Sequence, residues 1–67
     1  MEKLQTQQQL RAAIHKLTAA QQQVILLRFG EGLKISEVSC LMGKSEGAIK
    51  ILQHRALRRL RKLLKER

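Results

Sequence analysis

The sequence predicts an all-α fold: a small four-helix domain that contains a helix-turn-helix and has no wing or sheet. Leu, Gln, Lys, Arg and Ala dominate the composition, and all five residue types favour helices. Proline is absent, and Phe29 is the single aromatic residue. Apolar residues also recur at the three- and four-residue spacing of amphipathic helices. With 67 residues, we expect one domain over positions 1–67, either complete or part of a longer protein.

The first helix is expected over residues 6–16, with a polar, glutamine-rich start that frays. Its inner face should contain Leu10, Ala13, Ile14 and the following Leu17.

The second helix is expected over residues 19–29. Thr18 and Gln21 match a capping box, in which each side chain accepts a hydrogen bond from the other residue's backbone N–H. The apolar run at 24–27 is nearly continuous, which predicts burial on more than one side. We expect Gly30 and Gly32 to end this helix in left-handed conformations. The inner face should include Val24, Leu27 and either Ala20 or Phe29.

A third helix over residues 35–42 and a long fourth helix complete the prediction. Val38, Leu41 and Met42 are expected to face inward, with Cys40 as a small filler between them. Gly43 should follow in the left-handed conformation. Ser45 is placed to cap the fourth helix, and Glu46 in its first turn suits the helix dipole. Two helices joined by a short turn with a glycine, the second helix basic, are typical of a DNA-reading helix-turn-helix.

The charge points to an anionic partner. The formal net charge is +9 and the pI is near 11.0. Nine of the 14 Lys and Arg residues, against two Glu, fall within residues 44–67. Nucleic acid is the first candidate partner, and an anionic membrane surface, over which a basic amphipathic helix can lie, is a weaker second. The sequence has no apolar run long enough to span a membrane and no signal-peptide core, so we expect a cytoplasmic protein that does not bind membranes.

Projecting the fourth helix at about 100° per residue separates two faces. The apolar face contains Ile49, Leu52, Ala56, Leu60, Leu63 and Leu64, with Leu57 at its edge. The opposite, largely basic face contains Gly47, Lys50, Ile51, His54, Arg55, Arg58, Arg61, Lys62 and Lys65.

The start of the second helix of such a motif enters the major groove. We therefore predict that the DNA-contacting residues are Ser45, Glu46, Gly47, Lys50, Ile51, His54, Arg55 and Arg58. Gly47 would let the backbone approach DNA closely. Lys50 and Arg55 can donate to guanine or to phosphate. Arg58 and the basic residues beyond it are placed for phosphate contact or for a solvated face.

Three of these residues allow a second interpretation. For Ile51, contact with a thymine methyl group and a tolerated exposed apolar position are equally good interpretations. For His54, contact with a base or a phosphate is favoured over simple solvation. Glu46 can accept from a cytosine amine or serve the helix dipole alone.

Nothing in the sequence supports an enzyme. Cys40 with His15 and His54 lacks the spacing of a zinc site, so we expect no metal and no cofactor. A single cysteine forms no internal disulfide, which fits a reducing compartment.

Residues 17–64, LTAAQQQVILLRFGEGLKISEVSCLMGKSEGAIKILQHRALRRLRKLL, resemble region 4 of bacterial sigma factors, especially the extracytoplasmic-function (ECF) group. The combination of SEGAIK with HRALRRLR carries most of this resemblance. It implies recognition of the minus-35 promoter element by the DNA-facing residues above. It also implies docking on the β flap of RNA polymerase, and masking by an anti-sigma protein is common in this family. Lys34 stands where the family usually has a capping Ser, and Ser39 where it usually has Ala.

Two other interpretations stay open. The LuxR-type output domain of response regulators shares several motif positions, but there a His normally follows the motif Lys by two residues, whereas His54 follows Lys50 by four. The other alternative is a helical module whose main role is binding an anti-sigma protein.

Overall fold

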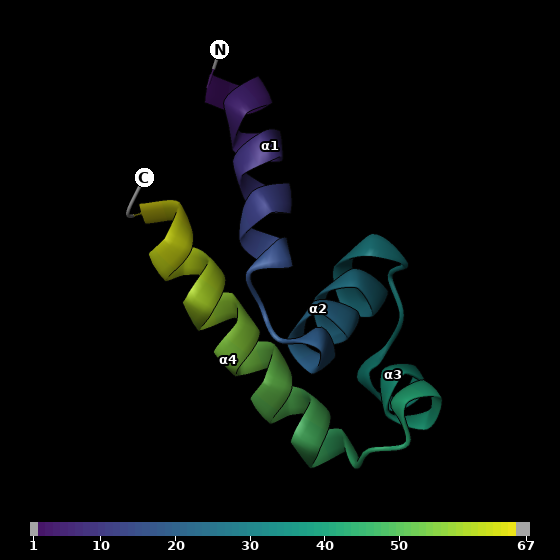
Figure 1. Ribbon diagram of the computed structural model, residues 1–67. Helices are drawn as coiled ribbons and strands as arrows, with labels where there is room; N and C mark the ends of the chain where they lie inside the picture. Colours follow the sequence, from purple (N-terminus) through teal and green to yellow (C-terminus); the bar gives the residue numbers. More distant parts are fainter. Residues whose placement is uncertain (1, 66–67) are drawn as a thin grey trace.

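The structure is a computed structural model that describes the backbone of residues 2–65 and the side chains of residues 8–65. Its elements are α1 (Glu2–His15), α2 (Ala19–Ile25), a π-helical turn η1 (Leu26–Gly30), α3 (Ile35–Met42) and α4 (Glu46–Lys65). No strand occurs among the described residues, so the all-α prediction is confirmed. The start of α1 and the end of α4 lie at the same end of the molecule (Figure 1).

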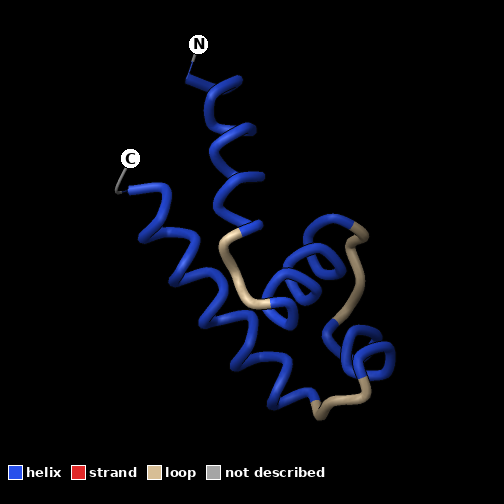
Figure 2. The backbone as a smooth tube through the Cα atoms, in the orientation of Figure 1, coloured by secondary structure: helices blue, strands red, loops and turns tan. Residues whose placement is uncertain are grey.

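Helix α4 is the scaffold on which the other helices pack. Its 20 residues correspond to a length of about 30 Å. Helices α1, α2 and α3 all contact it. In Figure 1, α1 runs beside the C-terminal half of α4, whereas α3 lies near its N-terminal end. Short loops connect these helices (Figure 2).

Two apolar clusters hold the fold together, one for each half of α4. Ala13, Leu17 and Ile25 pack with Ala56 and Leu60, which closes α1 and α2 onto the C-terminal half. The second cluster joins Val24, Val38 and Ile49, all fully buried, and so fixes α3 and the start of α4 to α2. Burial of a side chain of this size contributes about 1.5–3 kcal/mol.

The predicted caps are present where side chains supply acceptors. The Gln21 N–H donates to Thr18 Oγ1 at 3.2 Å, and the Thr18 N–H donates to Gln21 Oε1 at 3.3 Å. The Ala48 N–H donates to Ser45 Oγ at 3.1 Å at the start of α4. At α3, the Lys34 N–H donates to Glu37 Oε1 at 2.7 Å, but Lys34 has no side-chain acceptor to complete the box. The N-terminal capping box of α3 therefore has only one of its two hydrogen bonds.

Several boundary predictions are wrong. Helix α1 begins at Glu2 instead of residue 6. Regular α-helix ends at Ile25, and the chain continues as a π turn in which the Glu31 N–H donates to the Leu26 carbonyl at 2.9 Å. Of the two glycines expected in left-handed conformations there, Gly32 has a φ of 74°, whereas Gly30 lies within η1 and has no positive φ.

Burial predictions also fail at some positions. The π turn has more residues per turn than an α-helix and shifts the phase of the side chains, and Leu26 and Phe29 are 51% and 57% exposed. On α3, Ile35, Val38 and Met42 pack inward. Leu41 is about 90° away from the centre of that face and Cys40 is nearly opposite it, so both are exposed. Cys40 is thus no core filler.

Candidate nucleic-acid interface

The turn between α3 and α4 is fixed by Gly43 and Ser39. Gly43 has a φ of 67° and a ψ of 32°, the left-handed conformation that glycine adopts without strain. The Ser39 carbonyl accepts from the N–H groups of Gly43 and Lys44. In addition, the Ser39 hydroxyl donates to the Lys44 carbonyl. These bonds set the angle between the two helices of the motif.

The burial pattern of α4 determines which of its residues face outward. Ile49 and Ala56 are fully buried, and Leu60 is nearly so. All eight predicted DNA-contacting residues are consequently exposed, and Ile51 keeps 54% of its surface accessible. The structure thus brings the predicted residues together: Ser45 caps α4, and the others are exposed on that helix, namely Glu46, Gly47, Lys50, Ile51, His54, Arg55 and Arg58. Their contact with DNA stays a prediction.

Gly47 has no conformational or packing reason to be glycine within this chain. Its φ is not positive. A Cβ atom built there would meet only Ser45 Oγ, at 3.9 Å, which is an ordinary contact. The open space around Gly47 fits the expectation that an outside molecule approaches the backbone there.

The charged residues on this face are basic from Lys50 onward. After Glu46, every charged residue in the described part of α4 is Lys or Arg. Arg55, Arg58, Arg59 and Lys62 line one shallow hollow. A neighbouring hollow is lined by Arg58, Arg61, Lys62 and Lys65. Like charges this close repel one another, and a polyanion across them relieves that repulsion.

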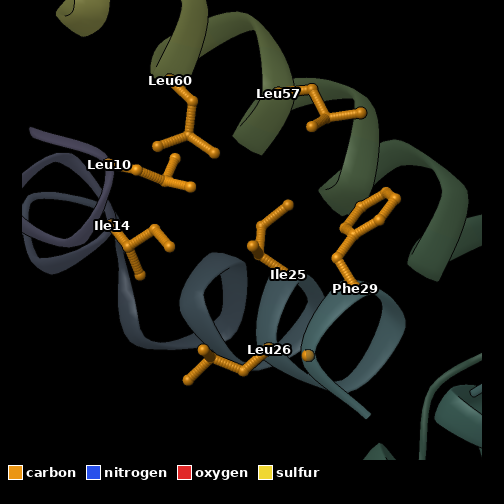
Figure 3. Close-up of a pocket in the computed structure, with 8 residues that line it drawn as sticks. Leu10, Ile14, Ile25, Leu26, Phe29, Leu57 and Leu60 are labelled. Atoms are coloured by element: carbon orange, nitrogen blue, oxygen red, sulfur yellow. The ribbon is translucent and has the colours of Figure 1, made fainter. Parts of the chain in front are cut away.

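An apolar groove, which sequence reasoning missed, lies between α1, η1 and α4. Its volume is about 350 Å³. Figure 3 shows the side chains around it, with Phe29 and Ile25 directed toward α4. The lining residues are Leu10, Ile14, Ile25, Leu26, Phe29, Gly30, Leu57 and Leu60. Their apolar character was visible in the sequence, but the run at 24–27 indicated core and not surface.

Sequence reasoning also missed Arg28. Its Nε donates to Gln53 Oε1 at 3.0 Å, and its Nη1 donates to the Leu33 carbonyl at 2.6 Å. An arginine inside an apolar run was the available signal. No group of three or more His, Cys, Asp or Glu side chains in the described part of the chain is arranged to hold a metal ion. None of the described helices has the length and apolarity to cross a membrane.

Comparison with known proteins identifies the family. The family described as sigma-70, region 4, matches residues 13–62. The chain is 50% identical over 52 residues to the ECF RNA polymerase sigma factor BldN of Streptomyces coelicolor, covering 78% of this chain and 20% of BldN. It is 40% identical over 45 residues to the ECF sigma factor SigD of Mycobacterium tuberculosis, covering 67% of this chain and 21% of SigD.

A solved structure agrees with these matches. One chain of the RsbN–BldN complex superposes with a TM-score of 0.84 at 45% sequence identity, over 87% of this chain and 42% of that one. The chain spans about a fifth of the length of the curated relatives it matches. The match favours the sigma-factor interpretation over the response-regulator one. This chain belongs to the sigma-70 region 4 family, and its relatives there are ECF sigma factors.

Proposed function

We propose that this chain is the promoter-recognition domain of an ECF sigma factor, which binds the minus-35 element of double-stranded promoter DNA and docks on the β flap of RNA polymerase to direct transcription initiation. The observation that carries the proposal is the phase of α4. Burial of Ile49, Ala56 and Leu60 turns the eight candidate residues outward on a helix that is basic to its end. Such a role places the protein in the bacterial cytoplasm.

The dimensions of α4 support a division between base and backbone contacts. Lys50 and Arg58 are separated by about 12 Å along the helix axis. That separation equals the width of the major groove, also about 12 Å. Residues up to Arg55 are therefore assigned to base edges or nearby phosphates. Arg58 and later residues lie at or beyond the flanking strand, where only phosphates are within reach.

The apolar groove supports the polymerase contact. Leu26 and Phe29 expose more than half of their surface beside it, and an exposed aromatic at the wall of a concave apolar site is typical of a protein-docking surface. The basic groups on α4 are near its Leu57 and Leu60 wall, so an apolar segment flanked by acidic residues fits best. We assign this groove to the β flap.

The second candidate role is regulation by an anti-sigma protein. It is favoured by one observation, the solved structure of a complex between BldN and RsbN. A protein that covers the groove or the outer side of α4 of this chain would block the polymerase or the promoter contact. In this alternative the chain still acts in transcription, but its dominant partner is a protein.

Binding of the chain to the purified β-flap segment tests the polymerase contact, with a helix-turn-helix repressor domain as the negative control. Phe29→Ser should raise the Kd at least tenfold, as loss of an aromatic anchor commonly does. Leu41→Ser is the matched control, because Leu41 is 66% exposed but lies on α3, away from the groove. Equal losses in both variants would remove the groove assignment. Absence of flap binding with retained sequence-specific DNA binding would leave a DNA-binding domain that works without polymerase.

A further inference from the structure

The side chain of Arg28 links three segments: η1, the loop before α3, and α4. Arg28 lies in η1, its Nε bonds Gln53 in the middle of α4, and its Nη1 bonds the Leu33 carbonyl in the loop before α3. No other hydrogen bond among the described residues joins groups so far apart along the chain. Both bonds are partly buried, which shields them from competing water.

One backbone hydrogen bond also joins two of these segments: the Leu33 N–H, in the loop before α3, donates to the Leu27 carbonyl in η1 at 3.0 Å. The core packing that holds α4 is apolar. Val24, Val38 and Ile49 pack α2 against α3 and α4. Apolar burial is strong but non-directional, so it resists separation of helices more than small rotations of one on another. A guanidinium is planar and holds its donors in a fixed fork. Two bonds from that fork therefore define an orientation that apolar packing alone leaves loose.

Gln53 transmits this constraint to the predicted DNA-contacting residues. On α4 it directly precedes His54 and lies one turn after Lys50. A small rotation of α4 at this point displaces both outward side chains relative to a base edge. Base recognition depends on such placement, whereas attraction to phosphates does not.

We propose that Arg28 is a positioning residue for promoter recognition: through Gln53 and the Leu33 carbonyl it fixes the orientation of α4 in which base edges are read. This inference rests on the proposed DNA-binding function. A direct phosphate contact by Arg28 is the competing role, because three of its five N–H donors have no bond to Gln53 or Leu33.

The test compares Arg28→Lys with Arg11→Lys, in the full 67-residue chain. Both substitutions keep the charge, and Arg11 is exposed on α1. Affinity is measured across a salt series for a duplex selected by the parent chain from a random pool and for a scrambled duplex. We expect Arg28→Lys to reduce the ratio of specific to non-specific affinity about tenfold, the effect of losing a charge-assisted bond. Binding to scrambled DNA and its salt slope should not change, and Arg11→Lys should alter neither quantity.

A double variant, Arg28→Met with Gln53→Met, tests whether the two side chains act through the hydrogen bond between them. If they do, the double variant should lower the ratio of specific to non-specific affinity no more than Arg28→Met alone. Equal loss on both duplexes in Arg28→Met, with the salt slope smaller by about one, would assign Arg28 to a phosphate and overturn the proposal. An unchanged specificity ratio in Arg28→Lys would overturn it as well.

A measurement without DNA separates this inference from the proposed function. The angle between α2 and α4 in solution follows from residual dipolar couplings of the backbone N–H groups. We expect this angle to change in Arg28→Met and to be unchanged in Arg11→Met. If the parent chain showed no sequence preference, the proposed function would fail, and this angle would still decide whether Arg28 orients α4. An unchanged angle would reject the positioning role.

Discussion

The Ser39 hydroxyl donates a hydrogen bond to the Lys44 carbonyl across the turn of the helix-turn-helix. An alanine at this position has no hydroxyl and could not form this bond. The bond leaves from the last turn of α3 and ends at the residue before the Ser45 cap of α4. It thus ties the end of one helix to the start of the next.

Ser39→Ala tests the contribution of this bond to stability. Removing it should lower the free energy of unfolding by about 1 kcal/mol. Alanine also has the higher helix propensity, which offsets part of that loss. Ser36→Ala on the same helix carries a similar propensity gain, and the Ser36 side chain is exposed. The informative quantity is the difference between the two variants in urea unfolding. If both variants gain stability equally, the hydroxyl contributes nothing.

Lys34→Ser should stabilise the protein. Lys34 occupies the N-cap of α3 with a φ of −77° and a ψ of 158°, the extended conformation of a capping residue. A serine hydroxyl there can accept from the Glu37 N–H and complete the box whose other half is already present. We expect a gain of about 0.5–1 kcal/mol in thermal or chemical unfolding. Lys16→Ser, which removes the same charge outside any N-cap, is the control. A gain of the same size in Lys16→Ser would attribute the effect to charge.

The features that the sequence predicted correctly depend on residues that are close together in the sequence. The Thr18–Gln21 box, the left-handed Gly43 and the Ser45 cap each need only residue types at fixed short spacings. The two faces of α4 were also predicted, because a 20-residue amphipathic helix repeats its pattern over several turns.

The errors occur where the chain departs from α-helical periodicity or where a packing partner decides. A π turn leaves no distinct pattern in the sequence, so the apolar run predicts burial of Leu26, although Leu26 lines a surface groove. Of the two alternatives for the inner face, Ala20 is half-buried and Phe29 is exposed in the same groove. The pattern of α3 predicts that Leu41 faces inward, but this helix has only eight residues, too few to fix the centre of its inner face. A shift of that centre by a fraction of a turn is enough to leave Leu41 exposed. The Arg28–Gln53 bond joins residues 25 positions apart, beyond any local rule.

Lys50→Ala and Arg55→Ala should weaken binding to the preferred DNA site by about 1–3 kcal/mol each and relax the base preference at one position. Both side chains are exposed on the outer side of α4 within the length that fits the major groove. Selection from a random duplex pool, repeated with each variant, measures the preference directly. Lys16→Ala is a matched control, because Lys16 is exposed, follows the end of α1 and is distant from α4 in the sequence. A uniform loss on all duplexes would reassign the residue to a phosphate.

Arg61→Ala should weaken binding to every duplex alike. Arg61 is about 16 Å beyond Lys50 along the helix, past the width of the groove. At that distance only a phosphate is within reach, and a phosphate carries no base identity. The slope of log affinity against log salt should therefore become shallower by about one, while the selected sequence stays the same. Lys50→Ala, measured in the same series, supplies the contrast because it should change the selected sequence. A changed base preference in Arg61→Ala would mean that α4 enters the groove further along its length than its N-terminal half, and an unchanged slope would place Arg61 in solvent.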